Sequence, residues 1–232
     1  MNFSEKLGKD QIKSVVILLY VTVAASIWKC FSIPDIDYVT QFWLGEYKII
    51  GAFVLFGLIP MGIVKFGFRE NLADYGLRFG VPKFTIRSFL VMAPAVAVVA
   101  YWTGHQSEFF DIYPFNEALR PQNTGLDQRS YERFAAHAML YLGYYFGWEF
   151  LFRGFLQHGL SERCGRPTAL LVQTLASTML HYGHPTTEVF GSIAAGLVWG
   201  FLAIRTKSIL SGLAQHTLLG IVLDWTLIFC RE

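Results

Sequence analysis

An acid, a base and an imidazole lie close together in the segment Gly147–Gly159, GWEFLFRGFLQHG. Glu149 and Arg153 are four residues apart, so a helix places them on one face with the acid N-terminal to the base, the better order for an ion pair. The flanking residues are apolar and aromatic, which predicts a membrane helix. Because charges are costly at that depth, we expect a functional site here. The alternative is an ion pair that only neutralises itself and orients two helices.

Further titratable side chains follow at positions that a helical hairpin brings to a similar depth. His181 ends one predicted span, with His184 and Glu188 just beyond it, and His216 lies inside the last span. At about 1.5 Å per residue, Glu149 and His181 are both roughly 20 Å from the same turn, and His216 is roughly 14 Å from that face. The spacing therefore permits one cluster of a carboxylate and two imidazoles within the membrane.

Such a cluster suits hydrolysis. Glu149, desolvated by aromatic neighbours, is a competent general base for water; His181 shares that water, and His216 donates to a developing oxyanion. The alternative is a divalent metal such as zinc, held by the same three side chains. The sequence contains no HExxH, which excludes the common zinc-protease helix. For each histidine a plain packing role is the competing interpretation, and we expect His137, among others, to be structural.

The composition predicts a membrane protein. Hydrophobic residues make up 53% of the 232 residues and charged residues only 16%, whereas about a quarter of a soluble protein is charged. The net charge of +2 and the absence of a basic cluster argue against nucleic acid as a partner. Three scattered cysteines give neither a disulfide framework nor a zinc knuckle. We therefore expect residues 1–232 to form one membrane domain in contact with the lipid bilayer.

The hydropathy pattern predicts an all-α, polytopic transmembrane bundle of about seven spans, judged against the roughly 20 residues that cross a bilayer. The segments are Ile12–Trp28, Ile49–Phe66, Phe84–Trp102, Phe134–Leu160, Thr168–Tyr182, Val189–Ile204 and Ile209–Phe229. The basic residues fall in alternate connections, which predicts a cytoplasmic N-terminus. These residues are Lys6, Lys9, Lys13, Arg69, Arg78, Lys83, Arg87, Arg163, Arg166, Arg205 and Lys207.

The connection FRENLADYGLRFG is too polar to cross the membrane. Asn71 is a suitable cap for a short helix, and Gly76 and Gly80 mark its end. We expect this segment to lie on the cytoplasmic surface.

Three motifs resemble the CPBP family of intramembrane proteases, the bacterial relatives of the CAAX prenyl protease type 2. WEFLFRGF is similar to the first family motif, EExxxR followed by Gly on a membrane helix. His181 in LHYGHP resembles the second motif, a His after FxxxH, and His216 in LAQHTLLG resembles the third, HxxxN or similar. GSIAAGLVWGFLAIRTKSILSGLAQH and DYGLRFG also resemble family segments. The resemblance covers about residues 70–228.

The resemblance implies a multi-pass membrane endopeptidase, placed in the cell membrane of a bacterium, that cuts a membrane-associated protein or peptide near the membrane face. It implies Glu149, His181 and His216 as catalytic residues, with Arg153 holding Glu149 or the fold. Members of the family have been described both as metalloproteases and as glutamate proteases. Zinc and metal-free chemistry therefore both stay open.

The chain departs from the family pattern at three positions. The first Glu of the EE pair, usually assigned to water activation, is Trp148; the Asn of the third motif is Gly220, and the Phe of the second is Ser177. Either Glu149 takes over as the base, or the chain is an inactive pseudoprotease that acts as a scaffold or chaperone for a partner peptide.

Two further alternatives follow from the remaining polar residues. His184 and Glu188 bring another imidazole and carboxylate that can compensate for the missing acid, although Glu188 also suits the start of a helix. A small transporter is a third interpretation, because ionisable residues inside helices also line ion paths. Against it, the sequence has no pair of broken helices in two matching halves.

Overall fold

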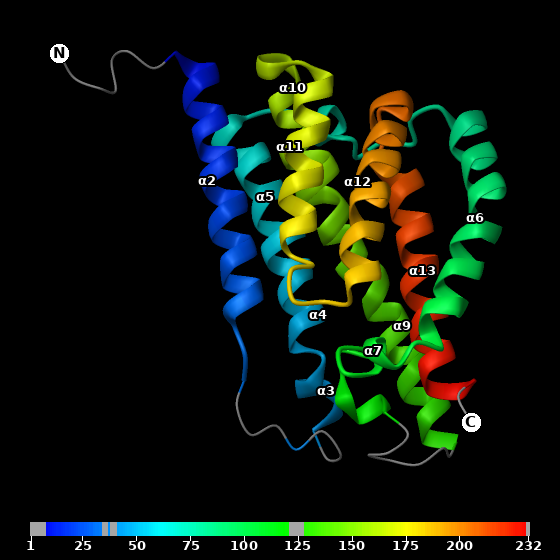
Figure 1. Ribbon diagram of the computed structural model, residues 1–232. Coiled ribbons are helices and arrows are strands. Elements are labelled where there is room, and N and C mark those ends of the chain that lie inside the picture. The colour runs from blue at the N-terminus through cyan, green and yellow to red at the C-terminus, as the bar shows by residue number, and fades with distance from the viewer. Residues whose placement is uncertain (1–7, 34–36, 38–40, 121–127, 231–232) are drawn as a thin grey trace.

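The computed structural model describes residues 8–33, 37, 41–120 and 128–230, so Lys6 of the N-terminal lysine group lies outside the described residues. In the part described, every regular element is a helix, which confirms the predicted all-α bundle. The long helices run side by side between two ends of the molecule (Figure 1). In chain order the elements are α2 Lys9–Cys30, α3 Phe42–Gly45, α4 Tyr47–Ala52, η1 Phe53–Leu58, α5 Ile59–Gly62, η2 Ile63–Phe68, η3 Leu72–Tyr75, α6 Pro82–Gly104, α7 Ser107–Phe110, η4 Glu117–Leu119, α9 Gln128–Glu149, η5 Phe150–His158, α10 Gly159–Cys164, α11 Arg166–Met179, α12 Thr186–Thr206 and α13 Leu210–Phe229.

Five of these helical stretches are long and apolar enough to cross a membrane. They are Gln11–Cys30, Tyr47–Phe68, Pro82–Gly104, Thr186–Thr206 and Leu210–Phe229. The fourth and fifth predicted spans are not among them: α11 has 14 residues, and the helix from α9 into η5 contains Glu149 and Arg153. η5 is enclosed by the other helices, with Phe150–Gln157 all buried. An enclosed helix does not face lipid, so its hydropathy is free to be lower.

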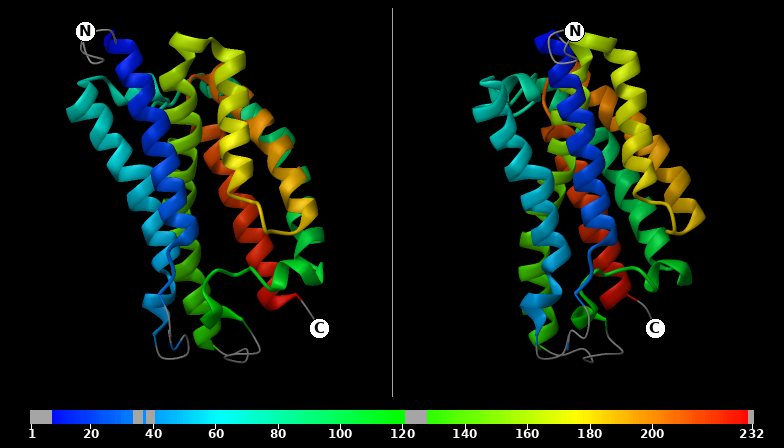
Figure 2. Two further views of the ribbon diagram at one scale, coloured as in Figure 1. Left: turned by 60° about the vertical axis from the view of Figure 1, so that its left-hand side comes forward. Right: turned by 90° about the vertical axis from the view of Figure 1, so that its left-hand side faces the viewer.

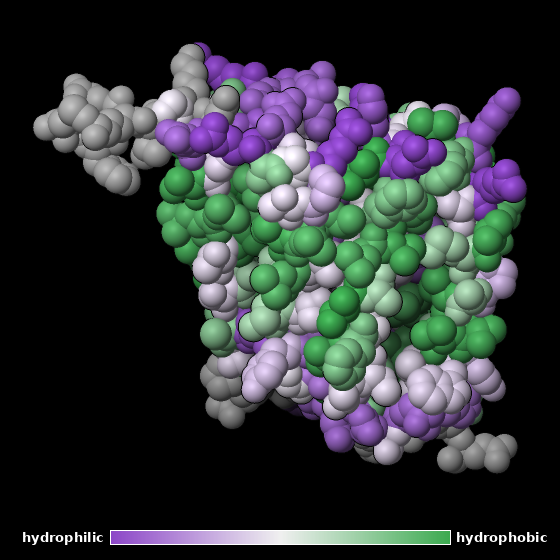
Figure 3. Space-filling model, turned by 45° about the horizontal axis from the view of Figure 1, so that its top comes forward, coloured by the Kyte–Doolittle hydropathy of each residue, from purple (hydrophilic) through white to green (hydrophobic). Residues whose placement is uncertain are grey.

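The molecular surface has the character expected of a membrane protein. Figure 3 shows an apolar band across the face in view, with hydrophilic residues gathered toward the two ends. α6 contributes strongly to the apolar surface, since Leu90, Val91 and Val98 are each about two-thirds exposed. Apolar side chains are stable in this position only when lipid or another apolar partner covers them. The protein is therefore a multi-pass membrane protein.

The central helix α9–η5 is held by a cluster of aromatic rings. Trp28 of α2 lies 5.8 Å from the ring of Phe56 and 5.9 Å from that of Trp148, centroid to centroid. Trp148 in turn lies 5.1 Å from Phe152, one turn further along the helix. Figure 2 shows α2 and the helix 47–68 beside each other on one side of the central helix. The other side of the central helix carries the candidate site.

The short helix predicted after Asn71 is present as η3. The side chain of Asn71 accepts a hydrogen bond from the backbone N–H of Ala73, at 3.0 Å. Gly76 and Gly80 have φ of +84° and +66°, conformations that glycine adopts without steric cost. The cap by Asn71 and the end of the helix at Gly76 thus agree with the prediction from the sequence.

Candidate active site

Glu149 and Arg153 form the ion pair that their spacing predicted. Glu149 is 0% exposed and Arg153 2%, and Arg153 Nη1 lies 3.3 Å from Glu149 Oε1. The pair stands where α9 changes into the π-helix η5. Such local widening of a helix is frequent at functional sites because it changes the direction of side chains. Arg153 also lies 5.9 Å above the ring of Trp199, so an aromatic face covers its guanidinium.

Glu149 is joined to His216 of α13, 67 residues away. Nδ1 of His216 lies 2.9 Å from Glu149 Oε1, and the imidazole packs between the rings of Tyr145 and Trp199, at 4.2 and 4.4 Å. The second carboxylate oxygen, Oε2, is buried without a hydrogen-bond partner in the described part of the chain. Gly212 makes room for it, because a Cβ added there would lie 2.5 Å from Oε2. The carboxylate is thus closed off behind the imidazole.

His181 belongs to a second polar group, at the connection between α11 and α12. Its Nδ1 lies 2.9 Å from the backbone oxygen of Ser177, and its Nε2 lies 3.8 Å from Glu188 Oε1. The same Glu188 oxygen bonds to His184 Nδ1 at 3.0 Å and accepts a hydrogen bond from the hydroxyl of Tyr113 at 2.8 Å. Burial, then the charge of Glu188, raise the pKa of Tyr113 well above its usual value, so Tyr113 stays a donor.

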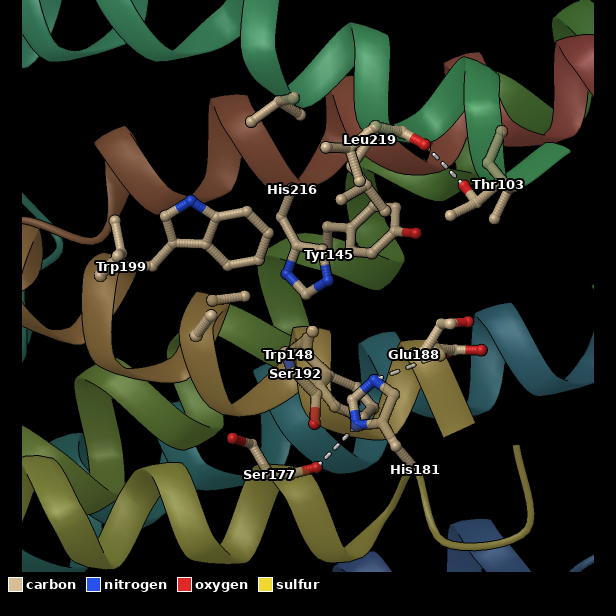
Figure 4. Close-up of a pocket in the computed structure, with 18 of the residues that line it drawn as sticks. Thr103, Tyr145, Trp148, Ser177, His181, Glu188, Ser192, Trp199, His216 and Leu219 are labelled. Atoms are coloured by element: carbon tan, nitrogen blue, oxygen red, sulfur yellow. Dashed lines mark hydrogen bonds and ion pairs between the residues drawn. The ribbon is translucent and has the colours of Figure 1, made fainter. Parts of the chain in front are cut away.

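The two groups face one cavity of about 420 Å³. His216 and Tyr145 line one wall and His181 and Glu188 another, with α6 and α12 closing the sides. Figure 4 shows the two imidazoles on opposite sides of this space. Trp148 also lines the cavity, with ring centroids 5.5 Å from His181 and 6.2 Å from His216. Glu149 itself does not line the cavity.

The proposed metal ligands do not converge. Glu149 and His216 are in contact, but His181 lies on the opposite side of the cavity (Figure 4), which Glu149 does not line. Among the described residues, no group of three His, Cys, Asp or Glu side chains is placed to hold a metal ion. The expected zinc site of Glu149, His181 and His216 therefore does not fit this arrangement, and we derive no step through a metal.

A third group of buried polar side chains surrounds His137, and the sequence did not predict that these residues meet. His137 bonds through Nδ1 to Glu46 Oε1, at 2.9 Å, and through Nε2 to Asp224 Oδ2, at 3.0 Å. Asn116 donates to Glu46 Oε1 at 2.8 Å, and all four side chains are fully buried. This group ties α9 and α13 to the segments before α4 and η4. These contacts agree with the structural role expected for His137. Its partners Glu46 and Asp224 could have been suspected from the sequence, because each is an acidic residue in apolar surroundings.

Comparison with known proteins agrees with the motifs quoted from the sequence. Residues 132–222 match the model of one protein family, described as type II CAAX prenyl endopeptidase Rce1-like. The matched region contains Glu149, Arg153, His181 and His216. No curated protein and no solved structure matched the chain. At the level of the family the match supports a CAAX-type intramembrane protease. Residues 132–222 are thus similar to the Rce1-like family, in agreement with the resemblance to the CPBP proteases.

Proposed function

We propose that the protein is an intramembrane endopeptidase that hydrolyses a peptide bond of a membrane-associated protein. One observation carries this proposal: two histidines, each beside its own carboxylate, face each other across an apolar cavity. His216 is paired with Glu149 at 2.9 Å, and His181 lies 3.8 Å from Glu188. Hydrolysis of an amide needs a base for water and a donor for the carbonyl oxygen, and two such pairs supply both.

His181 is our candidate for the base. A backbone carbonyl only accepts hydrogen bonds, so the contact with Ser177 requires the proton of neutral His181 to be on Nδ1. Nε2 then carries the free electron pair. Its separation of 3.8 Å from Glu188 Oε1 is too long for a direct hydrogen bond, but both groups can bond to one water molecule. His181 takes a proton from this water as its oxygen attacks, and returns the proton to the departing amine.

His216 is our candidate for the donor to the carbonyl oxygen. The Glu149 carboxylate only accepts hydrogen bonds, so Nδ1–H of His216 donates to it, and this bond orients the ring. In its protonated form the ring also carries Nε2–H, which donates to the oxygen that becomes negative in the transition state. Because Glu149 does not reach the cavity, we propose that it acts through His216, with Arg153 holding it, and not as the direct base for water.

The position of the cavity suggests where cleavage occurs. The basic turns with Arg163, Arg166 and Lys207 lie at the end of the bundle where α2 begins, whereas the connection with His181 lies toward the other end (Figure 1). If the basic turns are cytoplasmic, as charge predicts, cleavage takes place in the outer half of the cell membrane. The cavity lies between α6 and α12, so a substrate segment would reach it from the bilayer.

The test compares wild type with His181→Ala in proteoliposomes that contain a mixture of membrane proteins. Newly formed peptide termini are quantified by mass spectrometry, and His105→Ala serves as the control. His105 is exposed, and among the described residues its ring forms a hydrogen bond with the backbone oxygen of Tyr101 alone, at 2.9 Å. We expect the same new termini with wild type and His105→Ala and none with His181→Ala. No new termini with wild type, or undiminished cleavage by His181→Ala, would contradict the proposal.

One observation favours the alternative of a non-catalytic scaffold. The indole of Trp148 lines the cavity near both His181 and His216, and Trp148 stands at the position where the family pattern has its first Glu. A scaffold would hold a partner peptide in the cavity without cutting it. In the same proteoliposomes it would yield no new termini, yet the wild type and His181→Ala would be photo-crosslinked to the same peptides.

A further inference from the structure

Two glycines of α13 form notches on either side of His216. Gly212, His216 and Gly220 follow one another at intervals of four residues, and they face Tyr145 and Glu149, one turn apart on α9. A Cβ at Gly212 would lie 2.5 Å from the Glu149 carboxylate; one at Gly220 would overlap the Tyr145 hydroxyl and lie 2.6 Å from its ring. The carboxylate and the phenol are therefore each seated in a glycine notch beside the same imidazole.

The hydroxyl of Tyr145 has no hydrogen-bond partner among the residues that the structure describes. Two other partly or fully buried tyrosines differ, since Tyr113 donates to Glu188 and Tyr75 to Glu70. Tyr145 is only 6% exposed and lines the cavity. Unlike the hydroxyl of Tyr141, that of Tyr145 is not sealed inside the protein, so it is free to donate a hydrogen bond to a molecule bound in the cavity. The unpaired donor therefore points to a polar atom of a bound molecule.

The phenol and the imidazole share one wall. Their ring centroids are 4.2 Å apart with a tilt of 39°, and Figure 4 shows the rings side by side, across the cavity from His181. A carbonyl group attacked from the His181 side would turn its oxygen toward this wall. The reference pKa of a tyrosine hydroxyl is about 10, so a phenol keeps its proton at neutral pH and donates without any coupled proton transfer.

We propose that the Tyr145 hydroxyl is a second hydrogen-bond donor, beside His216, to the oxygen of the scissile carbonyl. The proposal rests on the proposed endopeptidase function. As the water oxygen bonds to the carbonyl carbon, the π electrons of the carbonyl move to its oxygen, and the proton of water moves to His181. The hydroxyl and His216 Nε2–H bond to that oxygen. When the C–N bond breaks, the carbonyl re-forms and the nitrogen receives the proton from His181.

The experiment compares Tyr145→Phe with Tyr141→Phe, once a cleaved peptide has been identified for the wild type. Tyr141 lies one turn earlier on α9, is 1% exposed, and also has an unpaired hydroxyl, but does not line the cavity. Both variants remove only one buried oxygen. We expect Tyr145→Phe to lower kcat by about 10²- to 10³-fold with little change in KM, as the loss of one oxyanion donor does elsewhere. Tyr141→Phe is expected to keep the wild-type kcat.

Each other outcome has a defined meaning. An unchanged kcat for Tyr145→Phe beside an active wild type overturns the role of Tyr145 and leaves the endopeptidase proposal standing. Equal losses in both variants, accompanied by equal falls in apparent Tm, also overturn it, because the effect is then one of packing. A wild type that cleaves no peptide overturns both proposals together.

Discussion

Gly212→Ala tests the contact that holds Glu149 behind His216. The added Cβ would lie 2.5 Å from Glu149 Oε2, 3.2 Å from its Cδ and 3.4 Å from Trp199 Cβ. Separations this short cannot persist, so a side chain must move. The carboxylate cannot move freely, because Oε1 is bonded to His216 and lies 3.3 Å from Arg153 Nη1. We expect the substitution to displace Glu149 and to weaken its bond to His216.

The magnitude follows from a comparison with Gly62→Ala. Both glycines lie inside helices, so both substitutions gain about 1 kcal/mol of helix propensity. Gly62 has nothing within 4 Å of an added Cβ. The difference between the two variants therefore measures the overlap alone, and overpacking of this kind costs about 1–3 kcal/mol. For a domain of this size, 1 kcal/mol corresponds to about 2–4 °C in Tm.

The assay is the apparent Tm of the detergent-purified protein, followed by intrinsic fluorescence, with peptide cleavage measured beside it. We expect Gly212→Ala to unfold roughly 2–12 °C below Gly62→Ala and to lose cleavage, while Gly62→Ala cleaves like wild type. Equal Tm values with wild-type cleavage in both variants would refute the reasoning, because the added methyl group would then fit beside Glu149 without displacing it.

Two other predictions concern charges at different depths. Arg153→Met removes the partner of the buried Glu149 carboxylate and is expected to lower the free energy of unfolding by about 3–5 kcal/mol. The double variant Arg153→Met with Glu149→Gln should recover much of the lost apparent Tm. If it does not, Arg153 stabilises the protein by packing and not by its charge. At the surface, burial alone would raise the pKa of Glu70, but hydrogen bonds from Lys13 and Tyr75 outweigh it and hold this pKa below its usual 4.5. The resulting stabilisation is present at neutral pH and is lost as the pH falls below about 4.5 through the lowered pKa. Wild type should therefore lose its Tm advantage over Glu70→Gln in acid, and an advantage that persists at low pH would contradict this assignment.

The candidate site could be predicted from the sequence only in part. Residues i and i+4 of a helix always share a face, so the Glu149–Arg153 pair followed from spacing alone. Counting residues along the spans placed Glu149 and His216 at compatible depths, and the two are in contact. Depth does not fix rotation about a helix axis, however. The count therefore did not reveal that His181 and His216 lie on opposite sides of a cavity (Figure 4).

Local pattern thus determined the helical bundle, its apolar band and the polar residues inside it, because hydropathy and helix periodicity act over short distances along the chain. Only the tertiary structure decided which of those residues meet. Glu149 is enclosed because Gly212 admits it, and His137 bonds to Glu46 and Asp224, which lie 91 and 87 residues away. Such contacts depend on the rotation and packing of whole helices, to which residues far apart in the sequence contribute together.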